Sequence, residues 1–425
     1  MKEQQQLLLL IDMYYPDTRA TTMCMQPIIE KFIKNGFSVN VLCVRTKHRA
    51  LKKEIFNNVQ IVRKYLFSYW IYQTWLDQKN SGKRGFVRIC AALCQKALDA
   101  VYGYNKHFQK FRASFSCKRM KNAALRIIKE KQISCILSVS APFSSHQLAS
   151  MLKQRVPELR WVAFEMDPYT YNLFDNYETP ESKASLEKKV FQNVDVLISQ
   201  KEIDDYNQRN GLRNGISQRV YQMIMPNMHL HVCPHKTEGK STDPISLIYT
   251  GGLDSIYRSP QKLFEILSVI PEGMVVLHLY GYDHGMFTKA YPDIKNKVIL
   301  HGQVTKDECD KAVDNADILV NIGNAVYNQT PSKLFDYMGT GKPIVNFSYS
   351  EEDTSLWYLK HYGLFLNIGM YEETSSALVG RFMNFCQENR STALSEKMLT
   401  KRMSDFLSDS VSGRIVEIIE STLEN

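Results

Sequence analysis

The 425-residue sequence lacks several features that would place it in particular protein classes. No stretch approaches the ~20 apolar residues that a membrane-spanning helix needs, and the apolar run at 7–11 is too short for a signal-peptide core. Nine cysteines occur without any C-x-x-C pair, which favours buried free thiols in a reducing compartment over disulfides or a zinc site. We therefore expect a cytoplasmic protein.

Glycine and proline are sparse, no short repeat of fixed period is present, and apolar residues make up 44% of the chain. These proportions argue against disorder and against a solenoid. A chain of this length exceeds the size at which one hydrophobic core stops growing, so we expect two domains of roughly 200 residues each.

Positive charge is concentrated in one segment, whereas the whole chain carries a net charge of +9. Residues 45–130 contain 20 Lys or Arg and only 4 Asp or Glu, interleaved with aromatic residues such as Trp70 and Trp75. This composition favours binding to the inner membrane surface, since each basic residue contributes about 1 kcal/mol near anionic headgroups and aromatic rings settle at the headgroup boundary. A solvated basic face and a nucleic-acid patch are the alternatives. No recognisable nucleic-acid module accompanies the charge, so we expect a peripheral membrane protein and no nucleic-acid partner.

Strand-like apolar runs alternate with helix-like periods along the chain, which is typical of parallel sheets wrapped by helices. We expect an N-terminal domain at 1–228 with a basic helical insertion at about 45–130. Its expected strands are 6–11, 37–44, 134–139, 160–164, 194–198 and 219–225. Its expected helices are 23–35, 85–102, 108–130, 145–154 and 181–192.

Residues 229–244 are rich in His, Pro, Lys and Ser, which indicates a linker. A second alternation follows in an expected domain at 245–400. Its expected strands are 245–250, 274–280, 297–300, 317–321 and 343–347, and the expected helices are 260–269, 305–315, 331–339, 374–388 and 395–408. A last helix at 410–423 belongs to a C-terminal segment, 401–425, that we expect to return to the first domain. The predicted fold class is α/β, with two Rossmann-like doubly wound domains.

Loops after three expected strands of the second domain carry glycines and one arginine. Doubly wound sheets bind ligands beyond the carboxyl ends of their strands. Glycine lets backbone N–H groups approach a phosphate, Arg258 can add a forked contact, and exposed backbone after the third strand can pair with a base edge. Each loop alone is also compatible with an ordinary tight turn. The candidate residues of these loops are Gly251, Gly252, Arg258, Gly281, Gly302, Gln303 and Val304.

A fourth loop, at 328–343, is the most informative one. Pro331 suits the first turn of a helix, whose N–H groups can hold a diphosphate with help from the Ser332 hydroxyl and the Lys333 charge. Asp336 lies one turn further, where a carboxylate can bind ribose or sugar hydroxyls. An ordinary amphipathic helix would instead leave Asp336 in water.

The order of these motifs resembles the C-terminal half of retaining glycosyltransferases of family four, which have a GT-B fold, and in particular those that assemble bacterial capsules and O-antigens. The segment PSKLFDYMGTGKP at 331–343 is the specific one. LLIDMYYPDTRATTMCMQPIIEKFIKNGFSVNVLCV, ILSVSAPFSSHQLASMLK and WVAFEMDPYT resemble N-terminal segments of the family, so the resemblance covers nearly the whole chain except the basic insertion. It implies two Rossmann-like domains that face a central cleft, with the donor held by the second.

The resemblance also implies roles for individual residues. Arg258 and Lys333 become diphosphate ligands, Asp336 the ribose-binding carboxylate, and residues 302–304 the base site. The family commonly has a second carboxylate eight positions before the ribose-binding one, where this sequence has Asn328, an amide that can still bond to sugar hydroxyls. Gly252 stands where an arginine is common, and 17–20 replace a glycine pair.

Glu165 and Asp167 close an expected strand of the first domain and match the acidic segment of the family. They could orient or deprotonate an acceptor hydroxyl, while Arg19 could meet phosphate across the cleft. The alternative for the two carboxylates is helix capping or ion pairing with Arg160 or Lys183. No D-x-D occurs in the sequence, so we expect neither a metal nor another cofactor.

The predicted activity is metal-independent transfer of a hexose, with retention of configuration, from a nucleotide diphosphate sugar. UDP is the preferred nucleotide, and the predicted acceptor is a lipid-linked saccharide in capsule or lipopolysaccharide biosynthesis. Two alternatives stay open. One is a nucleotide-sugar epimerase, and the other is a degenerate GT-B scaffold that binds a partner glycosyltransferase or the membrane.

Overall fold

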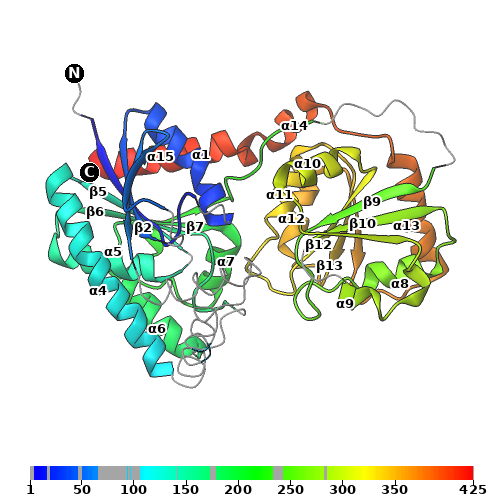
Figure 1. Cartoon of the computed structure of the whole chain (residues 1–425), viewed down its shortest axis with the longest axis horizontal. Coiled ribbons are helices and arrows are strands. Elements are labelled where there is room, and N and C mark those ends of the chain that lie inside the picture. The colour runs from blue at the N-terminus through cyan, green and yellow to red at the C-terminus, as the bar shows by residue number, and fades with distance from the viewer. Residues whose placement is uncertain are drawn as a thin grey trace. The chain divides into compact units, whose positions relative to one another are not determined.

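The computed structural model describes residues 4–16, 20–45, 50–65, 93, 96, 106–140, 142–172, 179–232, 243–281 and 285–424. The chain divides into two compact units (Figure 1). The first unit comprises Met1–Pro226 together with Asp409–Asn425, and the second comprises Asn227–Ser408.

The first unit is built on an eight-stranded sheet in the order β3-β4-β2-β1-β5-β6-β7-β8. All neighbouring strands are parallel except β3 and β4. The strands are β1 (Gln6–Leu10), β2 (Ser38–Val44), β3 (Lys53–Phe56), β4 (Val59–Lys64), β5 (Cys135–Val139), β6 (Arg160–Glu165), β7 (Val196–Gln200) and β8 (Val220–Met223).

Two hydrophobic cores cover the two faces of this sheet. In β1, Leu7 and Leu9 belong to one core while Leu8 and Leu10 belong to the other, so the continuous apolar run of this strand is buried on both sides. Helices α1 and α15 pack on the first core, and α4, α5 and α6 pack on the second. The helices are α1 (Ala20–Lys34), α4 (Lys106–Lys131), α5 (Ser144–Arg155), α6 (Pro180–Phe191), α7 (Lys201–Arg209), the 3-10 helix η1 (Ser217–Arg219) and α15 (Ser408–Glu424).

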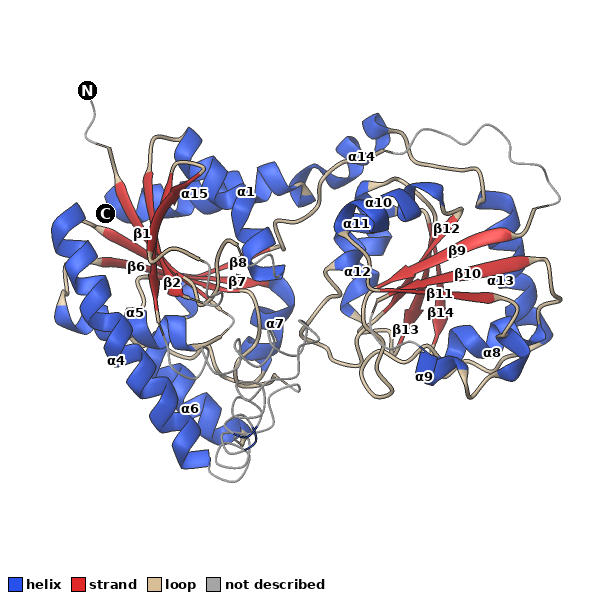
Figure 2. Cartoon of the chain, viewed as in Figure 1, coloured by secondary structure: helices blue, strands red, loops and turns tan. Residues whose placement is uncertain are grey.

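The second unit is built on a six-stranded, wholly parallel sheet in the order β11-β10-β9-β12-β13-β14. Figure 2 shows helices on both of its faces. The strands are β9 (Ile245–Thr250), β10 (Val275–Tyr280), β11 (Val298–Gly302), β12 (Ile318–Ile322), β13 (Ile344–Ser348) and β14 (Phe365–Gly369). The helices are α8 (Gln261–Val269), α9 (Gly285–Thr288), η2 (Pro292–Ile294), α10 (Lys306–Asn315), α11 (Lys333–Gly339), α12 (Thr354–Tyr362), α13 (Ser376–Asn389), α14 (Glu396–Met403) and η3 (Ser404–Phe406).

Most elements expected from the sequence are confirmed to within a few residues, and β9 has the predicted bounds. The predicted helix at 85–102 lies outside the described residues apart from Leu93 and Lys96. Elements β3, β4, α7, α9, α12 and β14 were not predicted, nor were the 3-10 helices η1 and η2. Five cysteines that the structure describes are free thiols, four of them buried, as expected.

The first part of the basic segment is a hairpin, which corrects its assignment as helical. Strands β3 and β4 pair antiparallel across Asn57 and Asn58, which have φ of 48° and 64°. Asparagine tolerates this left-handed conformation, which a two-residue hairpin turn requires. The rest of the segment either lies outside the described residues or forms α4, a confirmed helix.

Candidate functional site

The direction of the strand order changes at β9 in the second unit. Strands β10 and β11 follow on one side of β9, and β12, β13 and β14 follow on the other. The loops after β9 and β12 leave the same edge of the sheet but lead to opposite faces. The first leads to α8, which packs with the core on one face, and the second leads to α11, which is bonded to β9 from the other face. Ligands of doubly wound sheets bind at this switch point.

Arg258, in the loop after β9, is held across the switch point by Asn324, in the loop after β12. Its Nε and Nη2 atoms both donate to Asn324 Oδ1, at 3.1 and 2.6 Å. The Asn324 amide nitrogen donates to the carbonyl of Gln329 at 3.1 Å, and the N–H of Ala325 donates to the carbonyl of Tyr257 at 2.8 Å. A neutral amide fixes the guanidinium without cancelling its charge, so Arg258 presents a positioned cation at this edge.

Backbone hydrogen bonds tie the loops after β9, β10 and β11 together. The N–H of Gly251 donates to the carbonyl of Tyr280, and the N–H of Gly281 donates to that of Gly302, both at 2.8 Å. The φ angles of these glycines are 142°, 146° and 69°, values that favour glycine. A Cβ atom at Gly252 would meet no atom within 4 Å, so the backbone there is open to a ligand.

Helix α11 begins at Lys333, two residues later than predicted. Pro331 and Ser332 form a tight turn before it, since their carbonyls accept from the N–H groups of Leu334 at 3.0 Å and Phe335 at 3.2 Å. Both of these side chains are buried, and this burial sets the orientation of the helix.

Lys333 and Asp336 form an ion pair of 3.2 Å on the outer face of α11, with side chains 44% and 42% exposed. Lys306, at the start of α10, lies near them and was not predicted from the sequence. Burial disfavours its charge, but the hydrogen bond and charge of Asp310 and the charge of Asp336 outweigh this, and the pKa of Lys306 is raised. Arg258 in its loop and Lys333 and Lys306 at the starts of their helices thus bring three cations to the carboxyl edge of the sheet.

The remaining predicted donor residues differ in accessibility. Gln303 and Val304 are exposed after β11, where Thr305 and Glu308 form a capping box that starts α10. Asn328 is only 4% exposed, so its amide contacts protein atoms rather than bulk solvent.

Tyr337 is a structural residue of the site that sequence reasoning missed. Its hydroxyl accepts from the N–H of Thr250 at 2.8 Å and bonds to the Thr250 hydroxyl at 2.9 Å. Since Thr250 ends β9 and Tyr337 is in α11, these bonds fix α11 against the central strand. The available signal was a tyrosine among the apolar residues of a helix, a pattern that is too common to be specific.

Glu165 ends β6 in the first unit and is 1% exposed. Its Oε2 atom accepts from Ser199 Oγ at 2.6 Å and from Arg213 Nη2 at 2.5 Å. The ion-pair partner is therefore Arg213, neither Arg160 nor Lys183. Arg213 lies 48 residues further along the chain, a separation that local sequence reasoning does not bridge.

Asp167 lies in the loop after β6, beyond the strand that it was expected to close. Its backbone N–H donates to Ser140 Oγ at 3.3 Å, and the same hydroxyl accepts from the N–H of Met166 at 3.1 Å. Ser140 thus fixes the loop that carries Asp167. Arg19 lies outside the described residues.

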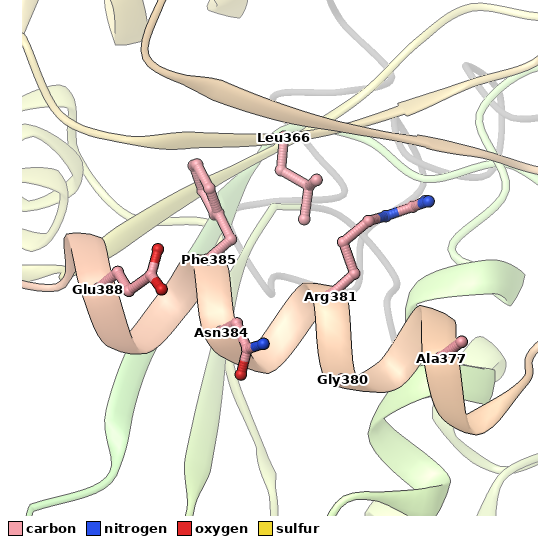
Figure 3. A pocket seen from close by; sticks show the side chains of 7 residues that line it. All are labelled: Leu366, Ala377, Gly380, Arg381, Asn384, Phe385 and Glu388. Atoms are coloured by element: carbon pink, nitrogen blue, oxygen red, sulfur yellow. The ribbon is translucent and has the colours of Figure 1, made fainter.

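Figure 3 shows a hollow on another part of the second unit. It lies along α13, lined by Arg381, Asn384, Phe385 and Glu388, with Leu366 of β14 opposite. Arg381 is paired at 2.9 Å with Glu372. The hollow contains none of the predicted site residues.

Two features that the described residues lack bear on the predicted chemistry. No helix among them has both the length and the apolar character needed to cross a membrane. Within the same part of the chain, no three His, Cys, Asp or Glu side chains gather so as to hold a metal ion. Metal-independent transfer stays a prediction.

No protein-family profile and no curated protein sequence matches the chain. Solved structures do. Sucrose-phosphate synthase from Thermosynechococcus elongatus is similar over 98% of both chains, with a TM-score of 0.63 and 13% identity. The chain has the GT-B fold.

Two further structures of this fold cover 99% of the chain at 11% identity. One, from E. coli, is named trehalose-6-phosphate and is bound with UDP-2-fluoro glucose; it is matched over 99% of its length with a TM-score of 0.56. The other is a putative UDP-N-acetylglucosamine 2-epimerase from Listeria monocytogenes, matched over 97% of its length with a TM-score of 0.53. The predicted fold class is confirmed, while an epimerase shares the fold, so the fold alone does not decide the reaction.

Proposed function

We propose that this protein is a retaining glycosyltransferase of the family-four type. It moves a hexose from a nucleotide diphosphate sugar, with UDP preferred, to a lipid-linked saccharide acceptor in surface polysaccharide biosynthesis. The observation that carries the proposal is Arg258, held by Asn324 at the switch point of the second sheet.

Cations at this point suit the departure of a nucleoside diphosphate. When the bond between the sugar and the diphosphate breaks, negative charge grows on the leaving phosphate oxygens. Preorganised donors stabilise such charge in the transition state, and Arg258 and Lys333 supply them here, with Lys306 nearby. Asp336 would exchange part of its pairing with Lys333 for the ribose hydroxyls.

The first unit offers acceptor chemistry at the carboxyl edge of its own sheet. Asp167 is the candidate for orienting or deprotonating the acceptor hydroxyl. Glu165, buried and bonded to Arg213, is better suited to positioning the loop that carries Asp167. Membrane binding is proposed for the basic segment, where Arg119, Arg126 and Lys129 of α4 are exposed.

Calorimetric titration with UDP tests the proposal. Lys333→Ala and Arg258→Ala should each weaken UDP binding about tenfold or more, since charge-assisted hydrogen bonds contribute about 1.5–3 kcal/mol. Lys311→Ala, which removes an exposed lysine of α10, serves as the matched control and should leave the affinity unchanged. If UDP and other nucleoside diphosphates fail to bind the wild-type protein, the donor site is refuted and a degenerate scaffold is favoured.

One observation supports the alternative that the protein is an epimerase, namely the structural similarity to a putative UDP-N-acetylglucosamine 2-epimerase. It predicts a changed sugar when the protein is incubated with UDP-N-acetylglucosamine alone, which proton NMR would detect. A transferase without an acceptor should leave the configuration of the sugar unchanged.

A further inference from the structure

Two rings stack in parallel at the carboxyl ends of β10 and β11. The phenol of Tyr280 and the imidazole of His301 lie with centroids 4.1 Å apart and planes 2° from parallel. Each residue directly precedes a glycine of the site, Gly281 or Gly302. His301 is exposed and Tyr280 is half-buried, so the pair is accessible from solvent.

The backbone and a third ring hold this pair in place. The register of β10 against β11 shifts between Leu279 and Tyr280, and the shift places Tyr280 opposite Gly302. His278 Nδ1 and His301 Nε2 form a hydrogen bond of 2.9 Å, which fixes the plane of the His301 ring. A flat aromatic surface is therefore preorganised before any ligand arrives.

The stacked pair and the proposed phosphate site at Lys333 lie on one face of the sheet. Leu279 of β10 belongs to the core that contains α8, so Tyr280 lies on the opposite face, and α11, which carries Lys333, bonds to Thr250 from that face. Cys309 of α10 connects the two places. Burial is the main cause of the raised pKa values of Cys309 and Tyr280. The charge of Lys333 acts against the rise at Cys309, and the charge of Cys309 adds to the rise at Tyr280, so Cys309 lies within electrostatic range of both residues. Strands lie about 4.8 Å apart, so β11 ends about 10 Å from β9, a span that the ribose and phosphates of a nucleotide can bridge.

We propose that Tyr280 and His301 form an aromatic shelf on which the nucleobase of the donor stacks, an inference that rests on the function proposed above. Every base has a flat π-face, and stacking on an aromatic side chain is a strong, sequence-tolerant interaction. The shelf would hold the base face-on while the exposed backbone at 302–304 meets its edge.

Another aromatic pair at this edge fits a base less well. Tyr349 and Tyr371, after β13 and β14, meet edge to face at 74° with centroids 6.2 Å apart. The Tyr349 hydroxyl is also occupied by the N–H of Ser259 at 2.8 Å. The observations therefore favour the β10 and β11 side.

Calorimetry with the full chain tests the shelf. UDP, CDP, GDP and ADP are titrated first, and the tightest binder is carried forward with inorganic pyrophosphate as a ligand that has no base. Tyr280→Ala and His301→Ala should both weaken nucleotide binding. Loss of the ring in contact with the base should weaken it by about 5- to 150-fold, because stacking contributes about 1–3 kcal/mol per base, and loss of the ring that supports it should weaken it less. Pyrophosphate binding should change less than twofold, and Tyr280→Phe, which keeps the ring, should retain nucleotide affinity.

Ile299→Ala is the matched control, since Ile299 is 45% exposed on β11 two residues before His301. It should leave nucleotide binding unchanged, and all variants should melt close to the wild type. If nucleotide affinity depends on Lys333 but not on Tyr280 or His301, the shelf is wrong and the proposed function stands. If no nucleoside diphosphate binds, both the proposed function and the aromatic shelf are wrong.

Discussion

The buried ion-pair network of the first unit predicts an unusual dependence of stability on pH. Arg213 contacts three carboxylates, those of Glu165 at 2.5 Å, Asp204 at 2.8 Å and Glu187 at 3.5 Å, and all four residues are at most 2% exposed. One guanidinium cannot balance three buried negative charges. Burial, followed by the charge of Glu165, raises the pKa of Glu187 to about 7, against the lowering effect of Arg213.

The sign follows from proton linkage. Glu187 binds its proton more tightly in the folded than in the unfolded state, so its contribution to stability is complete below its unfolded pKa. That contribution is lost as pH rises from about 4.5 to about 7. The loss is on the order of 3 kcal/mol across this window. Glu187→Gln keeps the shape and the hydrogen bond from Thr170 while removing the titration.

Hydrogen exchange followed by mass spectrometry measures the local stability of this network. Peptides from β6 and β7 are compared in urea at pH 5 and pH 7.5. The opening free energy of the wild type should fall by about 2–3 kcal/mol more than that of Glu187→Gln between the two pH values. Arg213→Met should lower it by about 3–5 kcal/mol, because three buried carboxylates lose their shared cation. An identical pH slope in wild type and Glu187→Gln would refute the reasoning.

Three further predictions concern single buried contacts. Burial lowers the pKa of His146 to about 3, so the contribution of the neutral His146 side chain to stability is lost as pH falls below 6.5. His146→Gln should therefore reduce the difference in urea stability between pH 7 and pH 4 by about 3 kcal/mol. Gly323→Ala would place a Cβ 1.9 Å from Asp353 Oδ2, and should lower stability in thermal unfolding by about 1–3 kcal/mol, whereas Gly252→Ala should not. Tyr337→Phe removes two hydrogen bonds to Thr250, and should cost about 1–3 kcal/mol in urea unfolding; an unchanged midpoint would contradict the role of this hydroxyl.

Strands buried on both faces could be predicted from the sequence because their apolar runs are continuous. β1, β5 and β9 are examples, and each is followed by turn residues or a helical period. The hairpin of β3 and β4 escaped prediction because Lys53, Glu54, Arg63 and Lys64 interrupt its apolar pattern. Arg63 is nevertheless buried and paired with Glu54 at 3.0 Å, a contact across the hairpin rather than along the sequence.

The features of the candidate site likewise divide into those that could be predicted from the sequence and those that could not. Glycines that require positive φ mark the loops after β9, β10 and β11, and they could be recognised because few other residues adopt that conformation. The partner of Arg258 could not be recognised, because Asn324 lies 66 residues away and only the strand order brings the two together. The Tyr280 and His301 stack depends on a register shift that the sequence does not display.

A crystal structure of the protein grown with UDP tests the central claim most directly. The proposal predicts the diphosphate within hydrogen-bond distance of Arg258 and Lys333, between the loops after β9 and β12, with the uracil beyond β10. A diphosphate bound elsewhere, or side chains that fill the space between those two cations, would contradict the assignment of the donor site.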